Sequence, residues 1–342
     1  MVIHGGIREK DFLDFSISVN PFVPEWFEDL SKLNEDLRRY TYIEWLEENF
    51  QNTFGNDTVI VAGAMEALHI IGWEFFKDSV VFIPVPNYYE YFRVASFSSF
   101  GIVKVPMVEN CEYKVENFEK LLKLVEKYRK IGKRMCFITS NPNNPTGIFL
   151  DLSELLNTLV DKGVLCIIDE AFLDFVDEEK LRSFENNLKV SKQIIRLRTF
   201  TKSFGLPGVR VGYVKSAEYK NVFLSRRMPW AVGGTGYVFL EKLLANDWKD
   251  FLKRTKKYIK NEMKKFASFD FFKSDANYFM VKVKEIDKVL DFLRLHRISV
   301  RDARSFEIGD FIRIGIKDSQ ANDFLLEKLK EISNLLVMKE GG

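Results

Sequence analysis

Between residues 58 and 215, short apolar runs alternate with stretches of helical periodicity, and this alternation limits the folds open to the chain. The run from Val164 to Ile168 is almost wholly apolar, which is typical of a strand buried on both faces. Similar runs before and after it are separated by helical patterns, which gives repeated strand–helix units. Such units favour a mostly parallel sheet with helices on both faces, so we expect a three-layer α/β domain.

The same periodicities predict the individual elements. Strands are expected over residues 58–62, 80–83, 102–105, 135–139, 164–168, 194–197 and 211–214. Helices are expected over 37–54, 63–76, 118–128 and 152–162, and a loop is expected between 197 and 211. One long helical pattern over 235–268 leads to a C-terminal α+β part. That part is expected to hold strands over 278–283, 298–300 and 311–316 and helices over 285–295 and 321–335.

The totals of the sequence exclude several classes of protein. With 342 residues, 46% of them hydrophobic, the chain can bury a large core, and we expect two closely joined domains. A net charge of +2 gives no reason to expect a nucleic acid or a membrane surface as the main partner. The three cysteines form no Cys-x-x-Cys pair and the three histidines lack metal-ligand spacing. Since no stretch resembles a membrane span or a signal peptide, we expect a cytoplasmic protein.

The segment from Thr199 to Tyr213 holds a single lysine, Lys202, among hydroxyl groups, glycines and apolar side chains. Surface lysines elsewhere in the chain occur in clusters, such as Lys256-Lys257. A lysine enclosed by apolar and small residues loses its proton more readily and becomes a nucleophile, for example toward an aldehyde. A lysine that only caps a neighbouring group is the alternative, and this segment alone leaves both interpretations open.

Two turns that follow predicted strands have a functional and a structural interpretation. Gly63 joins a strand to a helix, so the backbone N–H groups there form either an anion site or an ordinary strand–helix turn. Tyr88 follows a strand in a proline-rich loop, where its ring either stacks on a flat ligand or packs in the core. Both alternatives remain open for both turns.

Two polar strand ends and one arginine complete the set of candidate residues. Residues 140–147 form a rigid loop that contains Asn144, at a strand end where open α/β sheets carry ligand sites. Asp169 ends the buried strand, where a carboxylate is costly unless it faces a cation. Arg313 is flanked by apolar residues in a predicted strand, so a buried anion is the expected partner and a surface position is the alternative.

Together these residues specify one cofactor, pyridoxal 5′-phosphate. That cofactor requires a lysine for the Schiff base, a carboxylate at the pyridinium nitrogen, an aromatic residue on the ring face and a phosphate cup. An amino-acid substrate further requires an arginine for its carboxylate.

Three motifs carry a resemblance to a known family. They are Asn-Pro-Asn-Asn-Pro-Thr-Gly at 141–147, Asp-Glu-Ala at 169–171 and Thr-Lys-Ser-Phe-Gly-Leu-Pro-Gly-Val-Arg-Val-Gly-Tyr at 201–213. Over nearly its whole length the chain resembles the fold-type I, class I/II aminotransferases. This resemblance implies an aspartate aminotransferase-like fold, with a large cofactor-binding domain over 36–235 and a small α+β domain formed by 1–35 and 236–342.

The resemblance also implies the role of each matching residue. Lys202 matches the Schiff-base lysine and proton shuttle, Asp169 the partner of the pyridinium N–H, and Asn144 the residue that bonds the ring's phenolic oxygen. Tyr88 matches the stacking aromatic, and Arg313 matches the anchor of the substrate α-carboxylate. The residues that match the phosphate cup are Gly63, Ala64, Met65, Thr199, Thr201 and Arg210.

The resemblance further implies an assembly. Tyr40 resembles the tyrosine that reaches the phosphate of the neighbouring subunit, which implies a homodimer with shared active sites. Two positions depart from the family pattern. Phe172 stands where the family usually has a tyrosine, so the hydroxyl that bonds the phenolic oxygen is missing. The turn before the first helix is reduced, at residues 61–65.

Within the family, two groups share these motifs: the histidinol-phosphate aminotransferases and the threonine-phosphate decarboxylases of cobalamin synthesis. The segments at 4–6, 15–21, 169–172, 206–208 and 229–230 look more like the decarboxylases. We therefore expect an enzyme that acts at Cα of a phosphorylated amino acid, with His4, Asn20, Arg301 and Arg313 as substrate-binding residues. Arg301 could hold a substrate phosphate in either group. The alternatives are an aminotransferase and, more distantly, a non-catalytic binding protein on the same scaffold.

Overall fold

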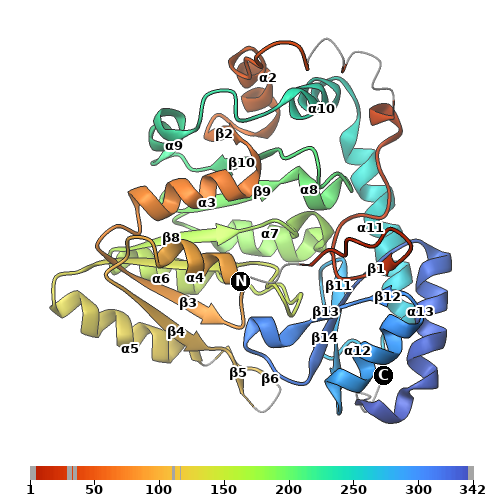
Figure 1. Cartoon of the computed structure of the whole chain (residues 1–342). Coiled ribbons are helices and arrows are strands. Elements are labelled where there is room, and N and C mark those ends of the chain that lie inside the picture. The colour runs from red at the N-terminus through yellow and green to blue at the C-terminus, as the bar shows by residue number, and fades with distance from the viewer. Residues whose placement is uncertain (1–4, 29–32, 34–36, 110–111, 116, 338–342) are drawn as a thin grey trace.

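The computed structural model describes residues 5–28, 33, 37–109, 112–115 and 117–337. Its largest sheet has seven strands, in the order β2-β10-β9-β8-β7-β3-β4 (Figure 1). Strand β10 is antiparallel to both of its neighbours, and the four pairs from β9 to β4 are parallel. The strands, in chain order, are β2 (Thr58–Val61), β3 (Ser79–Val85), β4 (Gly101–Pro106), β7 (Arg134–Ser140), β8 (Val164–Asp169), β9 (Ile195–Thr199) and β10 (Gly212–Lys215). The predicted α/β class with a mostly parallel sheet is confirmed.

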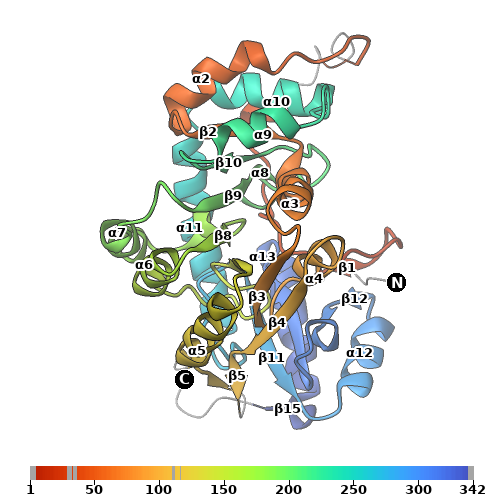
Figure 2. The same cartoon turned by 90° about the vertical axis from the view of Figure 1, so that its left-hand side faces the viewer.

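Helices cover both faces of this sheet, which gives three layers (Figure 2). One face carries α3 (Gly63–Glu74), α4 (Tyr89–Ala95) and α9 (Lys220–Arg226), and the other carries α5 (Asn117–Lys130), α6 (Ser153–Asp161) and α7 (Glu178–Asn187). Successive strand residues point to opposite faces. Val81 and Ile83 therefore pack with α3 and α4, whereas Val80 and Phe82 pack with α5 and α6.

A second, four-stranded antiparallel sheet has the order β13-β14-β11-β15. Its strands are β11 (Tyr278–Val283), β13 (Arg301–Asp302), β14 (Phe311–Gly315) and β15 (Leu336–Val337). Helices α11 (Trp248–Lys265), α12 (Ile286–Leu295) and α13 (Ser319–Glu331) bury the apolar side chains of one face of this sheet in one core cluster. The short elements are β1 (Leu13–Asp14), η1 (Glu25–Phe27), β5 (Val108–Glu109), β6 (Glu112–Tyr113), η2 (Leu173–Phe175), β12 (Ile298–Ser299), η3 (Ala303–Phe306) and η4 (Ser333–Leu335).

The N-terminal segment is joined to the C-terminal part of the chain. Strand β1 pairs in parallel with β12, and the Gly315 N–H donates to the carbonyl of Phe15 at 2.9 Å. We propose that these parts together form the small domain. Helix α10 (Gly234–Ala245) packs instead with α2 (Glu44–Phe54) and the edge of the large sheet, so we propose a boundary near Asn246 rather than at residue 235.

Three predicted elements differ from the structure, each for a local reason. The helix predicted over 37–54 begins only at Glu44, and the preceding Thr41 is buried, with its hydroxyl donating to the carbonyl of Val232. The helical pattern over 235–268 is broken after Ala245, because the Asp247 side chain accepts from two N–H groups and starts α11. The loop predicted between the strands around Lys202 contains one helical turn, α8 (Phe200–Ser203).

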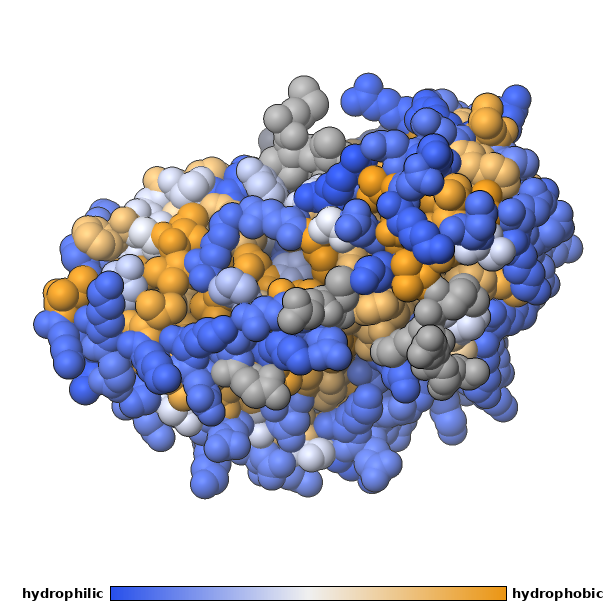
Figure 3. Space-filling view, turned by 90° about the horizontal axis from the view of Figure 1, so that it is seen from below, coloured by the Kyte–Doolittle hydropathy of each residue, from blue (hydrophilic) through white to orange (hydrophobic). Residues whose placement is uncertain are grey.

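In the described ranges, no helix is long and apolar enough to cross a membrane, and no three side chains of His, Cys, Asp or Glu are grouped to hold a metal ion. Figure 3 shows the face seen from below, where hydrophilic side chains predominate and hydrophobic ones reach the surface in separate patches.

Candidate active site

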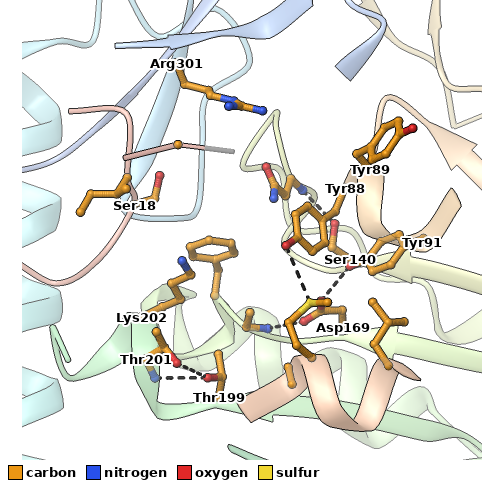
Figure 4. Close-up of a pocket in the computed structure, with 18 of the residues that line it drawn as sticks. Ser18, Tyr88, Tyr89, Tyr91, Ser140, Asp169, Thr199, Thr201, Lys202 and Arg301 are labelled. Atoms are coloured by element: carbon orange, nitrogen blue, oxygen red, sulfur yellow. Dashed lines mark hydrogen bonds between the residues drawn. The ribbon is translucent and has the colours of Figure 1, made fainter. Parts of the chain in front are cut away.

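A cavity of about 290 Å³ lies at the carboxyl ends of β7, β8 and β9, between the two sheets (Figure 4). Parallel strands end at the same edge of a sheet, so polar residues that follow them meet there. Of the residues predicted from the sequence, the cavity is lined by Ala64, Met65, Tyr88, Asn144, Asp169, Thr199, Thr201, Lys202, Arg210, Arg301 and Arg313. The structure thus brings together residues that lie up to 249 positions apart, from Ala64 to Arg313.

Lys202 is presented by the single turn of α8. Thr199 caps this turn, because its hydroxyl oxygen accepts from the Thr201 N–H at 3.2 Å. The Lys202 carbonyl accepts from the Asn20 N–H at 2.8 Å, which fixes the turn from the other side. Burial and the nearby positive charges of Arg313 and Arg210 lower the pKa of Lys202 to about 8. A large share of the amine is therefore neutral, and hence nucleophilic, near pH 8.

Asp169 ends β8 and is 8% exposed. Its Oδ2 accepts from the Tyr91 hydroxyl at 2.8 Å and its Oδ1 accepts from the Ala171 N–H at 3.0 Å. Burial raises the pKa of Asp169, and these two hydrogen bonds act in the opposite direction. A cationic N–H placed in the cavity would supply the positive partner that a buried carboxylate requires.

Asn144 and Arg313 connect the two sheets across the cavity. The Arg313 Nη1 donates to Asn144 Oδ1 at 2.7 Å, and Nη2 donates to the carbonyl of Ser16 at 3.0 Å. The Asn144 N–H donates to the Ser140 hydroxyl at 2.9 Å, which holds the loop against the end of β7. Burial lowers the pKa of Arg313 to about 10, because it disfavours the charged guanidinium. An anion bound beside Arg313 would offset this cost through charge-assisted hydrogen bonds.

The first turn of α3 forms a cradle with Arg210. Helix N-termini leave N–H groups without intrahelical partners, and these attract anions. Gly63 has φ +75°, and a Cβ at this position would lie 3.1 Å from Arg210 Nη2. Arg210 itself has φ +55°, which is rare for a non-glycine residue. The hydroxyls of Thr199 and Thr201 lie 2.7 Å apart beside the cradle. A phosphate group fits this donor set, and a side chain at 63 would crowd Arg210 and strain the backbone.

The Tyr88 ring lies on the wall formed by the start of α4. It packs edge-on against Tyr91 with centroids 5.5 Å apart, and its hydroxyl lies 3.9 Å from the Met65 sulfur. Since Tyr88 lines the cavity and also contacts buried side chains, it has both of the environments considered from the sequence. Phe172, the departure from the family pattern, packs on Tyr278 and lies 5.9 Å from the Lys202 Nζ.

Of the predicted site residues that the structure describes, Gly63, Asn20 and Tyr40 do not line the cavity. Asn20 lies behind Lys202, where its side-chain amide donates to the carbonyl of Ser203 at 2.7 Å. Tyr40 is 66% exposed and packs on Trp230, with ring centroids 4.6 Å apart and ring planes tilted by 35°. His4 lies outside the described residues. The substrate-binding role predicted for Asn20 and His4 and the intersubunit role predicted for Tyr40 stay predictions.

The sequence reasoning missed several residues of the site. Tyr91 follows Tyr88 by three positions, and this spacing on a helix would have placed both on one face. Ser140 stands directly beside Asp169 in the β7–β8 register, a contact that the end of two adjacent parallel strands implies. Ser18 and Phe306 also line the cavity, and no sequence signal in their segments distinguishes them.

Known proteins match nearly the whole length of the chain. The family model described as aminotransferase class I and II matches residues 12–329. Histidinol-phosphate aminotransferase of Thermoanaerobacter sp. (strain X514) is 27% identical over 311 residues, which cover 88% of this chain and 82% of that protein. A protein of Caldanaerobacter subterraneus subsp. tengcongensis provisionally named threonine-phosphate decarboxylase is 29% identical over 350 residues, 94% of this chain and 91% of that protein.

Solved structures show the same fold. Histidinol-phosphate aminotransferase from Clostridium acetobutylicum has a TM-score of 0.78 at 24% identity and covers 94% of this chain and 98% of that chain. The corresponding enzyme from Sinorhizobium meliloti, solved in complex with pyridoxal-5′-phosphate, has a TM-score of 0.75 at 20% identity, covering 93% and 89%.

Replacing Lys202 should reveal its lowered pKa in the cofactor-free protein. Because the pKa is about 8 in the folded chain and 10.5 for an unperturbed lysine, the folded state resists protonation. Above pH 10.5 the lysine is neutral in both states and does not lower the free energy of unfolding. As the pH falls from 10.5 to 8, only the unfolded state takes up the proton, so the free energy of unfolding decreases. Lys202→Met should therefore stabilise the protein by about 2 kcal/mol more at pH 6.5 than at pH 9.5. Urea unfolding at the two pH values measures this difference. The exposed Lys253→Met serves as control, and equal effects of Lys202→Met at both pH values would contradict the prediction.

Replacing Tyr91 should weaken the ionised form of Asp169. The Tyr91→Phe change removes a hydrogen bond that lowers the pKa of Asp169, so this pKa should rise further. Since a hydrogen bond to a charged group contributes about 1.5–3 kcal/mol, cofactor affinity should fall on the order of tenfold. The pH below which cofactor affinity declines should also move to a higher value. Fluorescence titration of the cofactor-free protein with pyridoxal 5′-phosphate at several pH values tests this. Tyr88→Phe, whose hydroxyl faces Met65, is the matched control, and coinciding acid limbs for the two variants would refute the assignment.

Proposed function

The chain belongs to the aminotransferases of classes I and II, and we propose that this pyridoxal 5′-phosphate enzyme is a threonine-phosphate decarboxylase, acting at Cα of a phosphorylated amino acid. The single observation that carries the substrate class is a pair of buried arginines. Arg301 and Arg313 are each 7% exposed, lie directly opposite one another on β13 and β14, and both line the cavity that holds Lys202.

Two buried guanidinium groups favour a ligand with two anionic groups. Burial lowers the pKa of both arginines, which means that the folded protein holds their charges at a cost. A carboxylate and a phosphate on one molecule would offset that cost at both sites, each through charge-assisted hydrogen bonds. Threonine phosphate carries both groups together with an amine, whereas histidinol phosphate carries a phosphate and no carboxylate.

The chain's own residues suit chemistry at Cα. When bound, pyridoxal 5′-phosphate supplies a ring that withdraws electrons from a substrate carbon. Asp169 would hold the proton at the ring nitrogen, and Lys202, with a pKa of about 8, would accept or donate a proton at the substrate. The cradle of α3, Thr199, Thr201 and Arg210 would hold the cofactor phosphate, and Asn144 would hold the ring's oxygen.

The geometry around the substrate decides which bond at Cα breaks. We infer that Arg313 holds the α-carboxylate, and that Arg301, which also donates to the Ser305 hydroxyl at 2.8 Å, holds the phosphate. Phe172 offers no hydroxyl beside Lys202. It belongs to residues 169–172, one of the segments that look more like the decarboxylases than the aminotransferases. A histidinol-phosphate aminotransferase, or another aminotransferase, is the second candidate, since named relatives of both kinds match the chain.

A homodimer with shared active sites and a cytoplasmic location are also part of the proposal. Aromatic and apolar side chains are exposed near Tyr40: Tyr42, Trp45, Met228 and Trp230 are 43%, 67%, 60% and 52% exposed. Exposed apolar surface of this kind supports burial against a second copy of the chain. Sedimentation of the holoenzyme at twice the mass of one chain is the expected result, and a monomer would exclude shared sites.

An assay with threonine phosphate separates the two candidate activities. The holoenzyme should release CO2 and form 1-aminopropan-2-yl phosphate without any oxo acid. Arg301→Gln should raise the KM on the order of 100-fold, because the phosphate loses a charge-assisted partner in a buried site. Measuring the CO2 released, and the amine product by mass spectrometry, tests both the reaction and the change in KM. If turnover instead requires 2-oxoglutarate and yields glutamate, the decarboxylase proposal is wrong and the aminotransferase candidate stands.

A further inference from the structure

One hydroxyl in the cavity has no role in the site described above. Ser18 is 2% exposed and lines the cavity, and its Oγ has no hydrogen-bond partner in the described part of the chain. A buried hydroxyl without a partner is destabilising, so such groups are rare unless something else binds them. The neighbouring Ser16 shows the usual case: its hydroxyl donates to Asp14 at 2.5 Å and accepts from the Gly6 N–H at 2.7 Å.

The segment that carries Ser18 is held at both ends by residues of the site. On one side, the carbonyl of Ser16 accepts from Arg313 Nη2. On the other side, the Asn20 N–H and side chain donate to the carbonyls of Lys202 and Ser203. Ser18 is therefore two residues, roughly 7 Å of extended backbone, from the contacts to Arg313 and to the Lys202 turn. In Figure 4, Ser18 lies on one wall of the cavity, between Lys202 and Arg301 in this view.

Close packing fixes this position. A Cβ at Gly315 would lie 2.5 Å from the carbonyl oxygen of Ile17 and 3.3 Å from the Ser18 Cα, so the segment lies directly on β14. Arg313 and Gly315 are two residues apart on that strand and share one face of it. Ser18 therefore sits beside the same strand face that presents Arg313.

Arg313 has a matching donor without an acceptor. Of its five N–H donors, one on Nη1 and one on Nη2 are used by Asn144 and Ser16, and its buried Nε has no partner in the described residues. The Ser18 hydroxyl and the Arg313 Nε–H are thus two unsatisfied donors on residues that line one cavity. An oxyanion that accepts from both would satisfy them together.

We propose that the Ser18 hydroxyl donates to the substrate α-carboxylate held by Arg313, and so selects substrates that carry a carboxylate on Cα. This assignment rests on the proposed function, because it takes Arg313 as the carboxylate anchor and leaves the phosphate to Arg301. Contact with the phosphate, or a purely structural role for Ser18, are the alternatives that the following experiment separates.

The experiment compares two ligands that differ only in the carboxylate. They are threonine phosphate and 1-aminopropan-2-yl phosphate, titrated calorimetrically into cofactor-loaded Lys202→Ala protein, which binds the amino acid without turnover. Adding Ser18→Ala should raise the dissociation constant of threonine phosphate about tenfold, as expected for one hydrogen bond to a charged group. The dissociation constant of the ligand without a carboxylate should change less than about twofold. Ser18→Cys, of similar size but a weak donor, should lie between wild type and Ser18→Ala.

Ser16→Ala is the matched control. Its hydroxyl bonds Asp14 and Gly6, so removing it should lower stability but leave the ratio of the two dissociation constants unchanged. Equal losses for the two ligands in Ser18→Ala, or no loss for either, would overturn the proposal. If the Lys202→Ala protein with Ser18 intact binds neither phosphorylated ligand, the proposed function fails. The same comparison with L-threonine and 1-aminopropan-2-ol then decides the role of Ser18 independently.

Discussion

The parallel pairing of β7, β8 and β9 is the constraint on which the site depends. It sets Ser140 directly beside Asp169, and Asp169 beside Leu197, two residues before the capping Thr199. The backbone hydrogen bonds of the sheet therefore fix the strand ends that carry the Asn144 loop, the carboxylate and the lysine turn, and the Ser140 and Thr199 hydroxyls complete the arrangement. The antiparallel β10 then returns Arg210 to the first turn of α3, which completes the cradle.

Burial, together with the charges in the cavity, explains why the lysine is reactive. Arg210 and Arg313 both disfavour a proton on Lys202, and Asp169 only partly offsets them. The same excess of positive charge prepares the cavity for a cofactor phosphate and an anionic substrate. One electrostatic arrangement thus favours both a neutral amine and bound anions, and each bound anion would raise the proton affinity of the lysine in turn.

The sequence predicted what depends on local pattern and on motifs. Strand and helix alternation predicted the sheet, because the period of the apolar residues changes between strands and helices. Motifs and the family resemblance named half of the described residues that line the cavity. Tyr91 was not found, because its contact is with Asp169, which is distant in sequence. Ser18 was not found, because it reaches the cavity through its neighbours Ser16 and Asn20, which bond Arg313 and the lysine turn far along the chain. Asn20 was expected in the cavity, but its amide bonds the backbone of the lysine turn. The helix start at Glu44 depends on a contact of Thr41 with Val232, which no local pattern contains.

The N-terminal segment that crosses the cavity also orders the assembly of the protein in time. Ser16 and Arg313 are 297 residues apart, and Asn20 and Ser203 are 183 apart. During synthesis, the seven-stranded sheet can pair well before β14 exists, whereas residues 13–20 must wait for the last part of the small sheet. Closing so long a loop is entropically unfavourable until both ends have surfaces to bind. The wall of the cavity that carries Ser18 is therefore made before the strands of both sheets and takes its place only after the large sheet has paired.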